Sequence, residues 1–317
     1  MDEYKSGGAN SVVLAGTCTA LAVVLSVIGF YMPLVSSIVF LLIPLPIAYL
    51  GMKEGLHWSL IVTAGVMILD SVFFGIISAA FLCAIFGILG VVMGICYKNK
   101  VSAQVTLLTG AAAVLAALIG EAVAAMYVLN MPSVLFGGAL DGMEAEMMAQ
   151  MEQFYTGALL TEAQANVKEM MEIIRKSLPF AAVGAALFYS WASMTLGKMV
   201  FTRMGIKDIP VLPPLERWEF PRIFAVLYIL ANGLEYFMKG QETVAFVGYN
   251  LGLFCFFIFW LQGLATLWWA PRQYPFVKAL RWPVAILSVF VGFVQTFIVL
   301  LGLSDMILSY RKKRNYQ

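Results

Sequence analysis

The residues best suited to bind a ligand in this sequence are polar side chains that lie inside long apolar segments. A carboxylate or amide is costly in lipid, so it normally faces neighbouring helices or a water-filled cavity. We assign five of them to substrate binding: Glu121, Asp70, Asn232, Glu235 and Asn250. A pocket built from such groups would bind a small solute, a cation or a proton.

Glu121 is the most deeply embedded of these residues, because it lies in the apolar run A-L-I-G-E-A-V-A-A. We predict that it anchors an outward-facing pocket, supported by Asp70 and Asn232 on neighbouring helices. The alternative is that these carboxylates simply reach the lipid headgroups. With the N-terminus in the cytoplasm, the polar residues placed in the outer third of the bilayer are Asp70, Glu121, Asn130, Asn232, Glu235, Asn250 and Asp305, whereas Gln262 falls toward the inside.

The sequence offers little for catalysis or metal binding. It has one histidine, His57, and four cysteines without paired spacing, at positions 18, 83, 96 and 255. H-E-x-x-H, G-x-S-x-G and the phosphate-binding G-x-x-x-x-G-K-[ST] motif do not occur. We therefore expect no enzymatic activity, no cofactor and no metal site, and any ATP hydrolysis would have to come from a partner subunit.

The composition predicts a polytopic membrane protein. Of 317 residues, 62% are hydrophobic and 12% are charged, against roughly 45–50% and about 25% in soluble domains. The net charge of +2 comes from short loops and does not indicate nucleic-acid binding. We expect an all-α bundle in the lipid bilayer with eight or nine transmembrane helices and an amphipathic helical insertion.

Nine segments are long and apolar enough to be candidate spans. They are 11–31, 34–50, 56–74, 75–97, 104–129, 179–201, 223–238, 244–270 and 283–310. The second contains Pro44 and Pro46, which predict a broken helix inside the bundle, because each proline frees a carbonyl that protein must satisfy.

Three regions follow from this pattern. Residues 1–201 form a six-segment bundle, 202–222 form a proline-rich cytoplasmic connection, and 223–317 contain the last helices and a basic tail. Residues 131–178 form an acidic extracytoplasmic insertion of two amphipathic helices, the second capped at Thr161 by T-E-A-Q.

The distribution of lysine and arginine places the N-terminus in the cytoplasm. Nine crossings would then put the basic cluster at 311–314 outside, against the same rule. We therefore favour eight crossings with both termini in the cytoplasm, and the sequence leaves open which segment does not cross.

Three blocks resemble the YybS-like family of uncharacterised bacterial multi-pass membrane proteins. They are F-L-L-I-P-L-P-I-A-Y-L-G-M-K-E-G from Phe40, the segment from Tyr249 to Ala265, and G-L-S-D-M-I-L-S-Y-R-K-K from Gly302. That family is distantly similar to the S components of energy-coupling factor transporters. The resemblance implies a substrate-capture bundle in the bacterial cell membrane, with a membrane coupling subunit and an ATPase as partners. S components typically carry A-x-x-x-A in the first helix, where this sequence has Gly16 and Ala20.

Two functions are consistent with the sequence. The first is a solute-binding or transport component that captures a small solute from outside. The second is a non-transporting membrane scaffold in envelope or sporulation processes, in which polar residues only hold helices together. Convergence of the carboxylates on one cavity would favour the first.

Overall fold

The computed structural model describes residues 2–128, 138–206, 208–238, 240–272, 274, 276–309 and 311; Asn130 lies outside them. Within these ranges the chain is helical, without a strand. This confirms the predicted all-α class. The chain forms two units, Met1–Met147 with Ala181–Leu212, and Met148–Phe180 with Pro213–Gln317. The division differs from the boundaries drawn from the sequence, because residues 148–180 belong to the second unit and 202–212 to the first.

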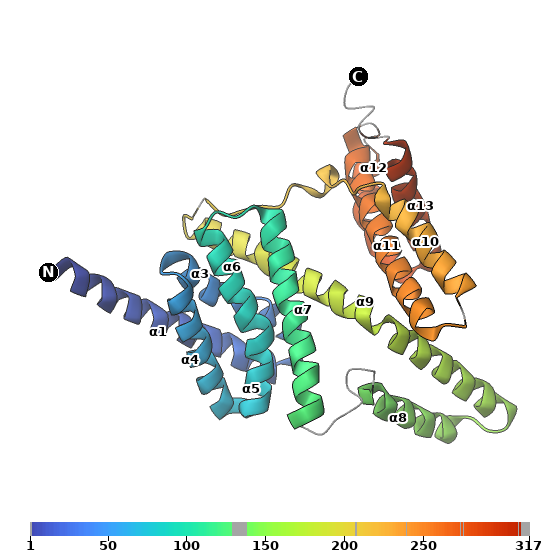
Figure 1. Cartoon of the computed structure of the whole chain (residues 1–317), viewed down its shortest axis with the longest axis horizontal. Coiled ribbons are helices and arrows are strands. Elements are labelled where there is room, and N and C mark those ends of the chain that lie inside the picture. Colours follow the sequence, from blue (N-terminus) through green and yellow to red (C-terminus); the bar gives the residue numbers. More distant parts are fainter. Residues whose placement is uncertain are drawn as a thin grey trace. The chain divides into compact units, whose positions relative to one another are not determined.

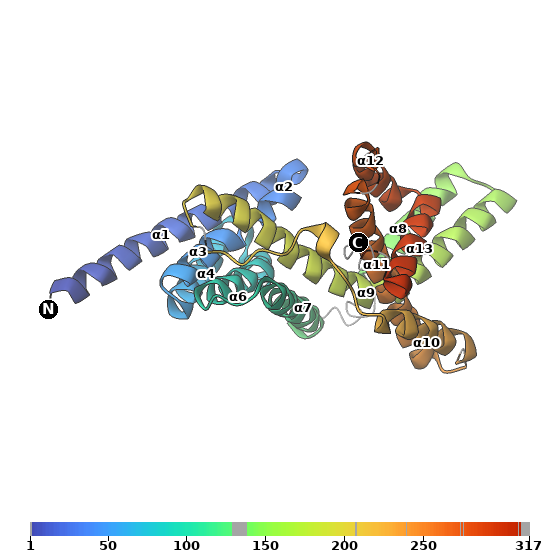
Figure 2. The same ribbon diagram turned by 90° about the horizontal axis from the view of Figure 1, so that it is seen from above.

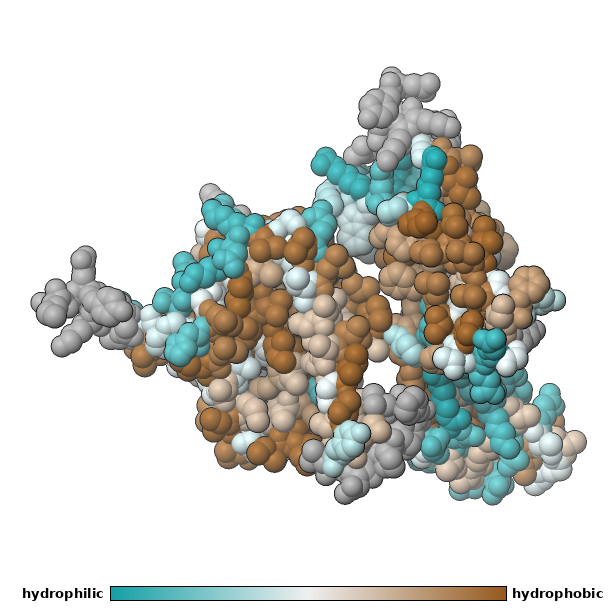
Figure 3. All heavy atoms as spheres, viewed as in Figure 1, coloured by the Kyte–Doolittle hydropathy of each residue, from teal (hydrophilic) through white to brown (hydrophobic). Residues whose placement is uncertain are grey.

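The first unit is a bundle of apolar helices. Its elements are α1 (Asp2–Tyr31), α2 (Pro33–Phe40), α3 (Pro44–Lys53), α4 (Leu56–Phe74), α5 (Ile76–Leu82), the π-helical turn η1 (Cys83–Gly87), α6 (Ile88–Lys98), α7 (Ala103–Val128) and the last part of α9 (Ala158–Arg203). The surface over α4 to α7 is mainly hydrophobic in Figure 3. Such a surface suits lipid contact.

Polar contacts fix the two ends of this bundle. At one end the hydroxyl of Ser11 donates to Glu54 at 2.9 Å, and Lys100 pairs with Asp208 at 3.6 Å. At the other end the hydroxyl of Tyr31 donates to the carbonyl of Phe73 at 2.8 Å. The basic loop residues 53, 98 and 100 therefore share one end, as the predicted orientation requires.

Close packing of two helices in this unit depends on a pair of glycines. Helices α3 and α6 lie side by side in Figure 1 and Figure 2. A Cβ atom on Gly90 would lie 2.8 Å from the carbonyl oxygen of Pro44, and one on Gly94 would lie 2.8 Å from that of Ala48. Only glycine lets these two backbones approach so closely.

The helix break at the prolines is buried inside the first unit. Pro44 and Pro46 lie in the first turn of α3, where a missing N–H costs little, and both are buried. The carbonyls of Phe40 and Leu42 accept bonds from the N–H groups of residues 43 and 45. The carbonyl of Leu41 accepts a hydrogen bond from Ser193 at 3.1 Å. Protein groups thus satisfy the carbonyls that the break leaves free.

We expect the double substitution Pro44→Leu and Pro46→Leu to lower the free energy of unfolding by about 1–3 kcal/mol, because both prolines are buried and leucine is larger than proline. Thermal unfolding in detergent would measure this loss. Pro33→Leu, at the exposed first position of α2, is the matched control and should be close to neutral. An unchanged melting temperature in the double variant would contradict a structural role for the break.

The second unit contains the remaining helices. They are α10 (Ile223–Phe237), α11 (Glu242–Trp269), α12 (Val277–Phe290) and α13 (Gly292–Leu308), with the first half of α9 and two 3-10 turns, η3 (Leu215–Arg217) and η4 (Ala270–Arg272). Helix α8 (Gly138–Phe154) lies in the insertion and contributes residues to both units.

Helix α9 corrects two predicted boundaries. It begins at Ala158 and runs through Pro179 to Arg203, so the second amphipathic helix and the sixth span are one element. Thr161 is not its cap, because its hydroxyl bonds the carbonyl of Gly157 from inside the first turn. Pro283 likewise lies inside α12 instead of beginning a span.

Seven helices in the described ranges are long and apolar enough to cross a membrane, and α10 is a shorter apolar helix. Helices α12 and α13 reach that length only as a pair, and this pair is bent by 114°. The segments 56–74 and 75–97 both have spanning length, joined at Gly75, whose φ of +85° favours glycine.

Candidate functional site

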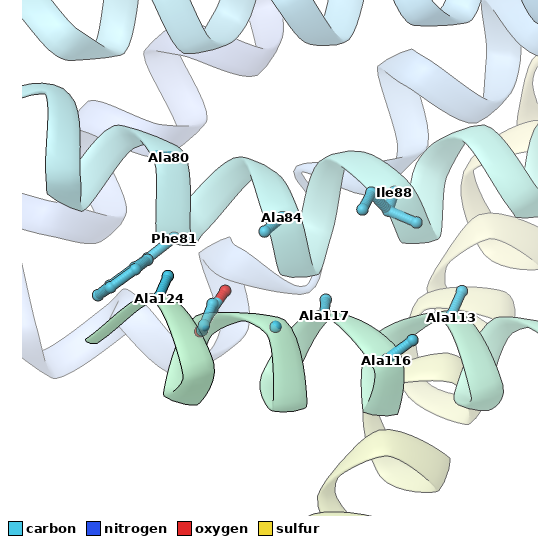
Figure 4. Close-up of a pocket in the computed structure, with 10 residues that line it drawn as sticks. Ala80, Phe81, Ala84, Ile88, Ala113, Ala116, Ala117 and Ala124 are labelled. Carbon is cyan, nitrogen blue, oxygen red and sulfur yellow. The ribbon is translucent and has the colours of Figure 1, made fainter. Parts of the chain in front are cut away.

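Glu121 lies in an apolar groove of the first unit. One wall is α7, and the other is formed by α5, η1 and the start of α6. Figure 4 shows Ala84 and Ala117 pointing toward one another from the two walls. The groove has a volume of about 470 Å³, and its lining residues are Ala80, Phe81, Ala84, Ile88, Ala113, Ala116, Ala117, Gly120, Glu121 and Ala124. Glu121 is therefore its one ionisable residue.

The carboxyl group of Glu121 lacks a protein partner on one side. Its Oε1 atom is buried and has no hydrogen bond within the described residues. A buried acceptor without a partner costs about 1–3 kcal/mol, and more when it is charged. A ligand with a donor or a positive charge would remove this cost.

Asp70 is the second buried carboxylate without a hydrogen bond. It lies on α4 and is fully buried, and neither carboxyl oxygen is bonded within the part of the chain that the structure describes. Ser26 on α1 is close enough to interact with it, but the Ser26 hydroxyl donates to the carbonyl of Ala22. Cys83 is close enough to Asp70 for an electrostatic interaction between the two side chains. Asp70 thus lies near α1 and the start of η1.

The π-helical turn η1 links these two carboxylates. Asp70 approaches it at Cys83, whereas the groove of Glu121 is lined by Ala84. Single π-turns are uncommon and occur frequently at functional sites. Residues 83–87 therefore lie between the groove of Glu121 and the surroundings of Asp70, although Asp70 itself does not line the groove.

Asn250 has a structural role on α11 in the second unit. Its Oδ1 accepts from the N–H of Phe180 at 3.1 Å, and its Nδ2 donates to the carbonyls of Lys176 at 2.8 Å and Phe246 at 3.0 Å. Residues 176 and 180 flank Pro179, which cannot donate to the helix. The amide of Asn250 thus supports α9 at its proline.

Asn232 and Glu235 are exposed on α10, also in the second unit. The amide of Asn232 donates to the carbonyl of Tyr228, one turn earlier in the same helix, at 2.7 Å. Lys176 is near enough to interact electrostatically with Glu235.

A buried polar network in the second unit was missed in the sequence analysis. Asp305 accepts from Gln262 at 2.6 Å and from the guanidinium of Arg311 at 2.8 Å. Arg311 also donates to the carbonyls of Glu216 and Trp218, at 2.8 and 2.7 Å. The predicted placement of Asp305 and Gln262 at opposite depths is wrong, because the two side chains are in direct contact.

This network joins three segments that are far apart in the sequence. Gln262 accepts from the N–H of Phe220 at 3.1 Å, and Arg222 donates to the carbonyl of Met306 at 3.2 Å. The proline-rich connection is thus bound to α11 and to the end of α13. The sequence analysis placed Asp305 in the outer third of the bilayer and Arg311 in a basic tail, so it did not pair the two residues.

The described ranges contain no cluster of side chains that could bind a metal ion. No group of three or more His, Cys, Asp or Glu side chains is close enough together there to hold an ion. Within those ranges, the chemistry available to the groove is that of a carboxyl group in apolar surroundings.

Comparison with known proteins agrees with a membrane bundle. The family described as "Predicted membrane protein (DUF2232)" matches residues 20–306. The chain belongs to this family. It is 25% identical over 310 residues to the "Uncharacterized protein YybS" of Bacillus subtilis (strain 168), with 93% of this chain and 95% of that protein covered. No solved structure is significantly similar to the chain.

Membership of this family confirms the resemblance to YybS-like proteins and the assignment to a bacterial membrane. The protein is a multi-pass membrane protein of the DUF2232 family. The more distant similarity to S components stays a prediction.

Proposed function

We propose that this DUF2232 protein is a solute-binding or transport component that captures a small solute in its first unit. The observation that supports the proposal is two carboxyl groups inside apolar helices, those of the buried Asp70 and the half-buried Glu121, whose buried oxygen atoms have no hydrogen-bond partner among the described residues. Carboxylates that lock helices together normally have partners. Within the described structure, Asp70 has none and the Oε1 atom of Glu121 has none.

The groove at Glu121 suits a small ligand. Ligand sites are typically cavities of about 300–1,000 Å³, mostly apolar, with a few polar groups that fix orientation. The groove, at about 470 Å³, has alanine walls and one carboxyl group. A solute with an apolar body and a positively charged or donating group would match both features.

The source of energy would lie in partner subunits. The sequence contains no phosphate-binding loop of the G-x-x-x-x-G-K-[ST] type. We expect a coupling subunit and an ATPase to supply ATP hydrolysis, and we expect the chain itself to have no enzymatic activity.

The second candidate function is a membrane scaffold. The second unit favours it, because Asn250 and the network around Asp305 use their polar atoms to hold segments together. A scaffold would need no ligand at Glu121. The two functions therefore differ in what they require of that carboxylate.

The substitution Glu121→Gln tests the proposal. The amide keeps the shape of the side chain and removes the charge. Loss of one charged hydrogen bond, worth about 1.5–3 kcal/mol, would raise the half-saturating solute concentration roughly ten- to hundredfold. Growth and solute uptake would be measured beside a full deletion, with protein level checked by immunoblot. We expect Asp70→Asn to impair uptake in the same assay.

The matched control is Glu146→Gln, the same chemical change at an exposed position of α8. It should behave like the unsubstituted protein. If the deletion has a phenotype and Glu121→Gln complements it completely, the proposal loses its central residue and the scaffold becomes the better explanation.

A further inference from the structure

We infer that α12 and α13 form a re-entrant hairpin, which enters the bilayer from the cytoplasmic side and returns to that side without crossing. The inference is independent of the proposed function. It concerns the second unit alone and identifies the segment that does not cross. Counting the shorter α10 as a crossing, it also gives eight crossings, with the proline-rich connection and the end of α13 on one side.

The first step is the path of α12 into the bilayer. The turn η4 connects its start to the end of α11 at Trp269. Near its other end, Ser288 accepts a hydrogen bond from the indole of Trp260 at 3.0 Å. Trp260 lies nine residues before the end of α11, or about 13 Å along the helix. Helix α12 therefore runs back along α11 into the apolar region.

The second step is the reversal at Val291. This residue is extended, with φ −116° and ψ 107°, and the helix axes on its two sides differ by 114°. Its N–H bonds the carbonyl of Leu287 and its carbonyl accepts from the N–H of Gln295. The irregular backbone is thus confined to one residue, and both of its own polar groups are hydrogen-bonded. Phe290 and Phe293 beside it are 81% and 83% exposed.

The third step is the position of the end of α13, which lies beside the start of α10, because Arg222 donates to the carbonyl of Met306 and to the hydroxyl of Ser309. Helix α13 packs against α11 at Gly302, which lies beside Phe259 and Gly263. One turn later, Asp305 contacts Gln262. Beyond the helix, Arg311 binds the carbonyls of residues 216 and 218, which precede the start of α10. Figure 1 shows α10, α11 and α13 grouped together in this unit.

These contacts define the two ends of the unit. The start of α10, the end of α11, the start of α12 and the end of α13 lie at one end, and the link between α10 and α11 at residues 238–241 lies at the other. A single span broken at Val291 would instead place the end of α13 beside that link. The geometry agrees with the positive-inside rule, because residues 217, 222 and 311 are all arginines.

Single-cysteine labelling tests the hairpin. Cysteine would replace Glu219 in the connection, Phe276 before α12, Leu308 at the end of α13, and Gln241 in the link between α10 and α11. A membrane-impermeant maleimide would be applied to intact cells and to inside-out vesicles. The four native cysteines are buried, and the unsubstituted protein gives the background.

We expect positions 219, 276 and 308 to be labelled only in inside-out vesicles and position 241 only in intact cells. A cysteine at Phe290, at the tip, should react with the impermeant reagent in neither preparation. Labelling of position 308 on the same side as position 241 would overturn the hairpin.

A C-terminal fluorescent-protein fusion gives a second readout if Leu308→Cys does not fold. Such a fusion becomes fluorescent only in the cytoplasm. We expect a bright fusion, and a dark but fully expressed fusion would equally overturn the proposal. Loss of uptake in Glu121→Gln would not affect either result.

Discussion

Replacing Arg311 by alanine is expected to lower the free energy of unfolding by about 3–5 kcal/mol. Arg311 and Asp305 are only 3% and 5% exposed. Removing the guanidinium would leave the Asp305 carboxylate with Gln262 as its one remaining side-chain partner among those described. It would also free the carbonyls of Glu216 and Trp218. An uncompensated buried charge is far more costly than a lost exposed ion pair.

Unfolding in mixed micelles with increasing SDS would measure this loss. The matched control is Lys100→Ala, which breaks an ion pair whose side chains are 78% and 82% exposed, and should cost about 1 kcal/mol or less. The double substitution Asp305→Leu and Arg311→Leu should be less harmful than Arg311→Ala, because no buried charge is left alone. Equal losses for Arg311→Ala and Lys100→Ala would show that the network does not stabilise the protein.

Gly302→Ala is the second substitution with a large expected effect. A Cβ atom on Gly302 would overlap the carbonyl oxygen of Phe259 on α11, and one on Gly263 would overlap the carbonyl oxygen of Ile298. The obstacle is backbone, so no rotamer change relieves it. We expect α11 and α13 to separate locally and the unfolding free energy to fall by about 3 kcal/mol, the upper part of the range for overpacked sites.

The matched control for this substitution is Gly292→Ala on the same helix. A methyl group there would meet no atom within 4 Å, so its effect on thermal unfolding in detergent should be small. A Gly302→Ala protein as stable as Gly292→Ala would contradict the close crossing of the two helices.

The amino-acid sequence by itself determined the class of this protein and identified the residues whose burial in an apolar helix costs the most free energy. Apolar blocks of about 20 residues can be stable only as helices in lipid, because every backbone polar group must be satisfied within the segment. The break at Pro44 follows from the missing N–H of proline. Glu121 and Asp70 could be singled out because a carboxylate is expensive in an apolar helix wherever its neighbours lie.

Only the tertiary structure decided which polar residues have partners. Asn250 was assigned to substrate binding together with Glu121, yet its partners are at positions 176 and 180, about 70 residues away in the sequence. Arg311 resembled part of a solvated basic tail, but it binds carbonyls more than 90 residues earlier. Local sequence fixes the cost of burying a polar group. Whether a buried polar group has a partner depends on which helices pack together over long sequence distances. In the second unit that packing depends on glycines such as Gly263 and Gly302, and no local sequence pattern identifies the residues that they contact.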